Sequence, residues 1–176
     1  TRVGLGTSVL LAALRHPVLL AQTAATVDQF SNGRLTLAMG VGGAFTDAQK
    51  NEWATAGVAK RTRATRMEEM VEIMRGLWSG YPVTFHGKHF DLDEVSLGYR
   101  PYQRPGVSIL LATHSGEGRS RQPARAARLS DGIISISDTP EEFAAVRARV
   151  AEEAAVINRS PNELKSVYYM TVNLDP

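Results

Sequence analysis

The sequence predicts an α/β fold, an incomplete (β/α)8 barrel that carries five of the eight strands. Five apolar, strand-like runs alternate with four helical patterns along the 176 residues, and this alternation is typical of a parallel sheet. Each strand–helix repeat takes about 30 residues once an inserted segment of about 25 residues is set aside, which is the spacing of a barrel that needs about 250 residues for eight repeats. We therefore expect part of a barrel.

The two ends of the chain support the same expectation. Thr1 leads straight into strand-like sequence, and Pro176 closely follows another such run, whereas a finished domain usually begins and ends with loosely held polar residues. We expect residues 1–176 to form a single barrel domain that is truncated at both ends.

Composition excludes several classes of protein. Lys and Arg number 20 and Asp and Glu number 18, so the net charge of +2 lacks the basic character of a nucleic-acid binder. The absence of cysteine excludes disulfides, thiol catalysis and thiolate metal sites. No apolar run approaches the roughly 20 residues that span a bilayer, and the first residues do not resemble a signal peptide. We expect a cytoplasmic protein that contacts neither membrane nor nucleic acid.

The first repeat is a buried strand over residues 3–11 followed by a helix over residues 17–30. Pro17 suits the first position of a helix, and Gly33 suits the left-handed conformation that ends one. The helix is apolar around much of its circumference. We therefore expect it to be buried on two sides, against its own sheet and against a second surface.

The second repeat is a strand over residues 34–39, a polar loop, and a helix over about residues 61–78 whose apolar positions recur with a 3.6-residue period. Residues 80–106 then interrupt the rhythm as an insertion, in which residues 81–105 form a small hairpin and a proline-rich loop.

The last three strands are predicted over residues 107–112, 132–136 and 167–174. A short helix rich in Ala and Arg, ending at residue 129, separates the first two. Thr139 and Glu142 stand at the spacing of a capping box, which predicts that the next helix begins between them.

Small and hydroxyl-bearing residues gather at the C-terminal ends of three predicted strands, where parallel α/β folds bind their ligands. Such residues and their backbone N–H groups let a phosphate or a flat ring approach closely. Glycines that merely permit turns are the competing interpretation, and the two stay open. The three strand ends are Gly6-Thr7-Ser8-Val9, Gly40-Val41-Gly42-Gly43 and Ala112-Thr113-His114-Ser115-Gly116.

Other motifs favour structural roles. A dinucleotide fingerprint would need a third glycine where Val9 and Phe45 stand. His86 and His89 flank a turn instead of sharing one helical face, which favours a solvated hairpin over a metal site. Three arginines of the short helix favour a solvated face over an anion site. We see no Ser/His/Asp triad and predict no metal.

Across nearly its whole length the sequence closely resembles the bacterial luciferase-like flavin-dependent oxidoreductases, whose motifs it carries in the family's order. The motifs are Gly6-Thr7-Ser8-Val9, RHPVLLAQTAATVDQFSNGR at 15–34, Gly40-Val41-Gly42, EMVEIMRGLW at 69–78, FHGKHF at 85–90, RPYQRP at 100–105 and AARLSDG at 126–132. The resemblance implies a TIM barrel of which this chain supplies about strands three to seven, with an insertion after strand four.

The resemblance also implies a cofactor site at the three strand ends. It implies a cis peptide bond between Ser8 and Val9 behind the flavin ring, and it places the other two strand ends toward the phosphate. Bacterial luciferase has an arginine where Val41 stands, so that charged contact is missing. The residues implied to bind cofactor are Gly6, Thr7, Ser8, Val9, Val41, Gly42, Gly43, Ala112, Thr113, His114, Ser115 and Gly116.

No catalytic residue is assigned, because the family's substrate-side residues come largely from segments outside this chain. His16 is the one histidine that the resemblance brings near the barrel mouth, and a helix-entry role before Pro17 is the stronger interpretation.

The first expectation is a luciferase-like monooxygenase that uses reduced FMN and oxygen on a small organic substrate, with a flavin reductase as partner. A hydride-transfer oxidoreductase that depends on a deazaflavin coenzyme stays open, as does a shortened, non-catalytic protein that binds flavin or dimerises. Members of this family commonly dimerise through helices two and three. We therefore expect a homodimer that uses the helix over residues 17–30.

Overall fold

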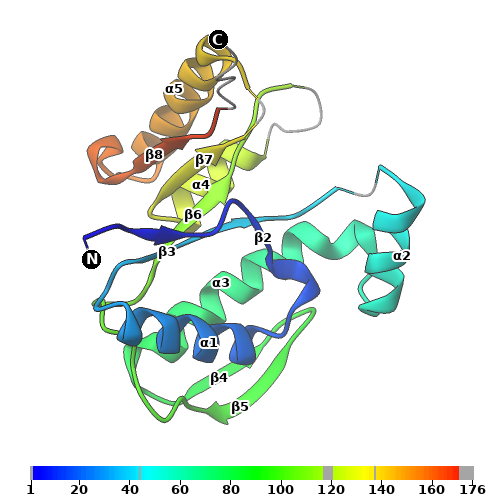
Figure 1. Cartoon of the computed structure of the whole chain (residues 1–176), viewed down its shortest axis with the longest axis vertical. Coiled ribbons are helices and arrows are strands. Elements are labelled where there is room, and N and C mark those ends of the chain that lie inside the picture. Colours follow the sequence, from blue (N-terminus) through cyan, green and yellow to red (C-terminus); the bar gives the residue numbers. More distant parts are fainter. Residues whose placement is uncertain (1, 44, 117–120, 137, 171–176) are drawn as a thin grey trace. The chain divides into compact units, whose positions relative to one another are not determined.

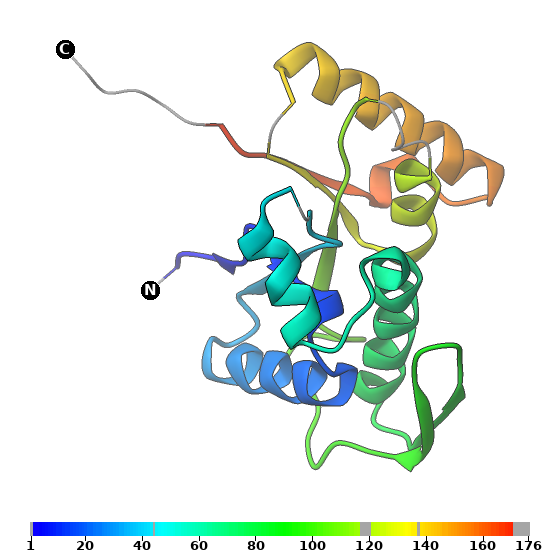
Figure 2. The ribbon, with the colours of Figure 1, turned by 90° about the vertical axis from the view of Figure 1, so that its right-hand side faces the viewer.

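The computed structural model describes residues 2–43, 45–116, 121–136 and 138–170 of the chain (Figures 1 and 2). The chain divides into two compact units, Thr1–Ser108 and Ile109–Pro176. In each unit a helix packs against a strand of a parallel sheet, so the predicted α/β class is confirmed.

The sheet of the first unit is built around β3 (Leu35–Gly40), with which β1 (Leu5–Gly6) and β2 (Leu10–Leu11) both pair in parallel. The continuous strand predicted over residues 3–11 is therefore wrong. Gly6 aligns with Thr36 and Leu10 with Met39, so the chain advances four residues while β3 advances three. The extra residue forms a bulge, and a bulge re-aims the side chains around it.

Helix α1 (Pro17–Phe30) begins and ends where the sequence predicts. Pro17 is its first residue, and Gly33, just past its end, has a φ of +74°. Near its end the buried Asp28 carboxylate accepts hydrogen bonds from the N–H and the Nε2 of Gln103, at 2.8 and 2.7 Å. The proline-rich loop is thus tied to α1.

Helix α3 (Arg63–Ser79) follows a 3-10 turn over residues 60–62 and packs against α1. The indole N–H of Trp78 donates to the Ala21 carbonyl of α1 at 3.0 Å. The apolar period found in the sequence is the buried face of the helix. Its buried residues are Met67, Met70, Val71, Ile73, Met74, Leu77 and Trp78.

A further helix, α2 (Asp47–Thr55), occupies a segment that the sequence analysis assigns to a polar loop. That assignment is wrong. The helix begins with a capping box, in which Thr46 and Gln49 each bind the other's backbone N–H. Trp53 is its single buried residue, so the segment lacks the apolar period that identifies a helix packed along one whole face.

The hairpin predicted within residues 80–106 is confirmed. Strands β4 (Val83–His86) and β5 (Asp91–Val95) pair antiparallel. The Glu69 carboxylate of α3 accepts the backbone N–H groups of Lys88 and His89 at 2.8 and 2.9 Å, which fixes the turn of the hairpin on the helix.

The second unit, which begins one residue into β6 (Ser108–Ala112), contains a parallel sheet of β6, β7 (Gly132–Ser135) and β8 (Lys165–Tyr168), with β7 in the middle. Strand β8 begins two residues earlier than predicted, and the last part of the predicted 167–174 run lies outside the described residues. The register aligns the C-terminal ends of the strands: Ala112 pairs with Ile134, and Ser135 with Tyr168.

Helices α4 (Gln122–Leu129) and α5 (Pro140–Val156) pack against each other in this unit. The predicted capping box at the start of α5 is confirmed, because Thr139 and Glu142 each bind the other's backbone N–H. Arg159 donates to carbonyl oxygens at the end of α4, which satisfies groups that the helix itself leaves without a partner.

Within the described ranges, none of the helices has both the length and the apolar character needed to cross a membrane.

Candidate functional site

The bend between β1 and β2 carries Gly6, Thr7, Ser8 and Val9. The Ser8–Val9 peptide bond is cis, as the resemblance implies. Thr7 joins the bend to β3 twice, since its N–H donates to the Thr36 carbonyl at 3.3 Å and its Oγ1 to the Ala38 carbonyl at 2.7 Å. The Thr7 hydroxyl therefore holds the bend in place.

The turn after β3, residues 41–43, is held from two helices. Trp53 of α2 donates its indole N–H to the Gly43 carbonyl at 2.9 Å, and Arg63 of α3 donates its Nε–H to the Gly42 carbonyl at 3.1 Å. Gly42 has a φ of +70°, and a Cβ added there would lie 3.0 Å from both Leu11 and Trp53. The turn therefore requires glycine at this position.

Sequence reasoning misses Trp53 and Arg63. Trp53 lies on the helix that the sequence analysis assigns to a loop, and Arg63 lies in the first turn of α3 with no motif to mark it. The Thr46–Gln49 capping box is the sequence pattern that indicates the start of α2 and could have placed Trp53 on a helix. Arg63 brings a guanidinium group to the turn that follows β3.

In the segment after β6, residues 113–116, polar groups form hydrogen bonds to other residues of the second unit. Thr113 is fully buried, and its hydroxyl donates to the Leu111 carbonyl at 3.2 Å. The His114 N–H donates to Gln122 Oε1 at 2.9 Å. Gly116 has a φ of +100°, and a Cβ added there would meet no atom within 4 Å, so its backbone conformation and not crowding favours glycine.

Ser115 binds a residue that the sequence analysis did not single out, Asp138, which follows β7. The Ser115 N–H lies 3.2 and 3.3 Å from the two carboxylate oxygens, and its Oγ donates to Oδ1 at 3.0 Å. The hydroxyl of Ser135, the last residue of β7, donates to Oδ2 at 2.7 Å. These contacts join the ends of two neighbouring strands.

Asp138 is 7% exposed, and its surroundings decide its charge. Burial by itself raises the pKa of this carboxyl, but the hydrogen bonds from Ser135 and Ser115 and the proximity of His114 lower the pKa by more. His114 Nδ1 lies 3.7 Å from Oδ2. The net pKa lies below the ordinary value, so Asp138 is a buried carboxylate at neutral pH.

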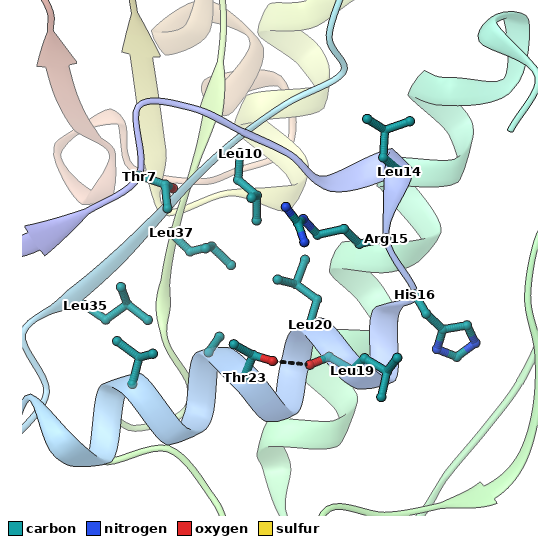
Figure 3. A pocket seen from close by; sticks show the side chains of 12 residues that line it. Thr7, Leu10, Leu14, Arg15, His16, Leu19, Leu20, Thr23, Leu35 and Leu37 are labelled. Atoms are coloured by element: carbon teal, nitrogen blue, oxygen red, sulfur yellow. Dashed lines mark hydrogen bonds between the residues drawn. The ribbon is translucent and has the colours of Figure 1, made fainter. Parts of the chain in front are cut away.

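A pocket of about 550 Å³ lies in the first unit between α1 and β3 (Figure 3). Arg15 extends over it, whereas the ring of His16 points away from it and makes an edge-on contact with Phe90, with the ring centroids 5.8 Å apart. The Thr23 hydroxyl at its rim donates to the Leu19 carbonyl at 2.8 Å. His16 thus has the helix-entry role: it precedes Pro17 as the N-cap of α1.

The profile of a family described as luciferase-like monooxygenase matches residues 1–176. The F420-dependent glucose-6-phosphate dehydrogenase of Beutenbergia cavernae is 32% identical over 180 residues, which cover 99% of this chain and 50% of that protein. The enzyme of the same name from Mycobacterium tuberculosis strain H37Rv is 33% identical over 184 residues, 99% of this chain and 51% of that protein. The chain thus spans about half the length of these relatives.

Solved structures agree with the sequence comparisons. An F420-dependent secondary alcohol dehydrogenase in complex with an F420–acetone adduct is 25% identical and superimposes with a TM-score of 0.79, over 96% of this chain and 49% of that one. Monooxygenase RslO1 from Streptomyces bottropensis is 26% identical with a TM-score of 0.77, over 95% and 49%. The fold is that of an incomplete luciferase-like TIM barrel, and the chain belongs to the luciferase-like monooxygenase family.

Proposed function

We propose that this chain is part of an oxidoreductase that depends on the deazaflavin coenzyme F420 and transfers hydride to or from a small organic substrate. The observation that carries the proposal is the similarity, across 99% of the chain, to two F420-dependent dehydrogenases at 32% and 33% identity. When bound, the coenzyme would supply the hydride chemistry, while the protein would bind it, orient it and exclude water.

The residues at the strand ends of the first unit fit such a cofactor. The turn is held through its carbonyl oxygens, and the N–H groups of Gly42 and Gly43 donate to no other residue in the part of the chain that the structure describes. A backbone that presents N–H groups without side chains suits an anionic or flat ligand. Thr7, Ser8 and Val9 would support the ring, and Gly42 and Gly43 would meet a polar part of the cofactor.

A monooxygenase that uses reduced FMN and oxygen, the first expectation from the sequence, is the second candidate. Monooxygenase RslO1 supports it at 26% identity over 95% of the chain. The F420-dependent relatives support the hydride-transfer alternative better, since both are more similar in sequence. In the monooxygenase case a flavin reductase would be the partner that supplies reduced FMN.

A titration of the protein with F420 and with FMN separates the two. The indole of Trp53 donates to the Gly43 carbonyl, so the fluorescence of Trp53 should change when a ligand binds at the turn. Trp78, whose indole donates to the Ala21 carbonyl of α1, should not respond. We expect saturable binding of F420 that is about tenfold tighter than that of FMN, a difference of about 1.4 kcal/mol. The Trp53→Phe variant, which keeps Trp78, should lose the fluorescence signal, and calorimetry of the same variant measures the binding that remains.

Two outcomes would contradict the proposal. Tighter binding of FMN would favour the monooxygenase. If neither cofactor binds while circular dichroism shows a folded chain, the shortened, non-catalytic protein becomes the better account.

We further propose that the chain forms a homodimer through α1. Two large apolar side chains of α1 are exposed: Leu19 is 63% and Phe30 87% exposed. Phe30→Asp should convert a dimer into a monomer in analytical ultracentrifugation, and Tyr81→Asp, which changes an exposed aromatic residue outside α1, should not. A monomeric wild-type protein would refute the dimer.

A further inference from the structure

We propose that Asp138 is the positioning residue of the 113–116 segment, and that Ser115 is bound to this carboxylate instead of to a phosphate group of the cofactor. The second part of the inference concerns a segment that the family resemblance implies to bind the cofactor phosphate, and to that extent it rests on the proposed function. The first part concerns the ligand-free protein alone.

The contacts around the carboxylate carry the first part. The Ser115 N–H and Oγ and the Ser135 Oγ all donate to the two oxygens of Asp138, at 2.7 to 3.3 Å. Hydrogen bonds to a charged acceptor are roughly twice as strong as neutral ones. Ser115 therefore has both of its donors committed to one buried partner.

The backbone of Asp138 is held as well. Tyr168, the last residue of β8, donates its hydroxyl to the Asp138 carbonyl at 2.7 Å. The Tyr168 ring stacks on Phe143 of α5, with the ring centroids 5.0 Å apart and the planes 19° from parallel. A carboxylate anchored from a third strand and a helix cannot easily turn away from Ser115 to admit another anion.

The second part of the proposal, that Ser115 does not bind a phosphate, rests on the repulsion between two negative charges. A phosphate that accepted the same two donors would lie within contact distance of the Asp138 carboxylate, and two anions at that separation repel each other strongly in a buried setting. The described titratable groups that face Asp138 are His114, 3.7 Å away, and Tyr168. One imidazole cannot neutralise both a carboxylate and a phosphate.

By this inference Ser115 does not offer its N–H and hydroxyl to a phosphate. Thr113 also has both of its donors bound within the protein, since its N–H donates to the Ile134 carbonyl at 3.1 Å and its hydroxyl to the Leu111 carbonyl at 3.2 Å. The segment's donors instead maintain its own conformation.

Nuclear magnetic resonance of the ligand-free protein tests the first part. The Ser115 amide signal should move as Asp138 is protonated in acid, and in Asp138→Asn this movement should disappear. Hydrogen exchange of the Ser115 amide should be about tenfold faster in the variant, because a charged hydrogen bond is lost. Asp131→Asn is the matched control, since Asp131 accepts the Ile109 N–H at 2.7 Å elsewhere in the unit. Unchanged Ser115 exchange in Asp138→Asn would overturn the proposal.

Ser115→Ala tests the second part by comparing ligands with and without a phosphate. We expect the affinity ratio of FMN to riboflavin, and of F420 to its phosphate-free ribityl deazaflavin, to stay within about twofold of the wild-type ratio. A selective loss of about tenfold for the phosphorylated member of a pair would overturn the proposal.

Inorganic phosphate provides the readout if no flavin binds. A saturable shift of the wild-type Ser115 amide upon phosphate addition would overturn the proposal, and an unmoved signal would support it. Failure of both cofactors to bind would contradict the proposed function and leave the Ser115–Asp138 result standing, so the two failures are distinguishable.

Discussion

Two loops of this chain follow a buried parallel strand and consist mostly of small residues: the turn at residues 41–43 and the segment at residues 113–116. They differ in which of their backbone groups the neighbouring side chains bind. Neighbouring donors, Trp53 and Arg63, bind the carbonyl oxygens of the first. A neighbouring acceptor, Asp138, binds the N–H and hydroxyl of Ser115 in the second. The first loop therefore keeps the N–H groups of Gly42 and Gly43 for a ligand, whereas the second uses the N–H of Ser115 within the protein.

Trp53→Ala removes the donor that holds the first of these regions and should have the largest effect. The side chain is 3% exposed and packs with Ala13 and Val58. Loss of a buried aromatic residue costs about 3–5 kcal/mol of unfolding free energy. Urea denaturation measures the loss.

Trp53→Phe is the control for that substitution, because it keeps most of the packing and loses the bond to the Gly43 carbonyl. We expect it to cost about 1 kcal/mol. If the two variants were equally destabilised, the hydrogen bond and not the packing would hold the turn.

Asp138→Ala makes the matching change in the second region. It removes the buried carboxylate that accepts hydrogen bonds from the Ser135 hydroxyl and the Ser115 N–H, which should cost about 2–3 kcal/mol. Thermal and urea unfolding of the variant measure this cost. A loss below about 0.5 kcal/mol would show that the carboxylate does not hold the segment.

The pH dependence of stability follows from the lowered pKa of Asp138. A carboxyl whose pKa is lower in the folded than in the unfolded chain stabilises the fold above its unfolded pKa, here about the ordinary value of 3.8. That contribution is lost as the pH falls through the folded pKa. The stability difference between wild type and Asp138→Asn should therefore be constant near neutral pH and shrink below about pH 4. A difference that does not change with acid would show that Asp138 has no lowered pKa.

Gly42→Ala tests whether the first turn depends on close contact as well as on backbone conformation. Gly57 is the matched control, since its φ is +65° and a Cβ there would meet nothing within 4 Å. Gly57→Ala should cost about 1 kcal/mol through φ alone. Gly42→Ala should cost about 1–2 kcal/mol more, because its Cβ would press on Leu11 and Trp53 at 3.0 Å. Equal losses in urea denaturation would mean that the neighbours yield.

The sequence predicts what depends on local pattern. Pro17 and Gly33 place α1 correctly, and the Thr139–Glu142 capping box places the start of α5. Helix α2 is not predicted because its one buried residue gives no apolar periodicity, although its capping box is recognisable in the sequence. The resemblance adds the cis peptide at Ser8–Val9, which no local pattern indicates.

The polar contacts of the site could not be predicted in the same way. Asp138 lies 23 residues after Ser115, and nothing in the sequence between them marks the pair. They meet because β6 and β7 pair in register and end together. Which donors a strand-end loop keeps for a ligand therefore depends on tertiary contacts that no motif encodes.

Arg63→Lys should have the smallest effect, and it tests whether the second donor to the 41–43 turn acts on the turn or on the ligand. The guanidinium donates to the Gly42 carbonyl at 3.1 Å and to the Lys60 carbonyl at 2.9 Å, and an ammonium group at the end of a lysine cannot reproduce both bonds in the same plane. We expect a loss of about 0.5–1.5 kcal/mol in urea denaturation.

Arg61→Lys, at an exposed position two residues earlier, should cost nothing measurable and controls for the change of side chain. If Arg63→Lys leaves stability unchanged but weakens binding of F420, the arginine acts on the ligand, and the turn is held by Trp53 alone. If stability falls and the affinity of the folded protein is kept, Arg63 holds the carbonyl oxygens in place so that the N–H groups of Gly42 and Gly43 face outward. We expect the second result, because the 41–43 turn is held through its carbonyl oxygens, whereas Ser115 of the 113–116 segment is held through its N–H and hydroxyl.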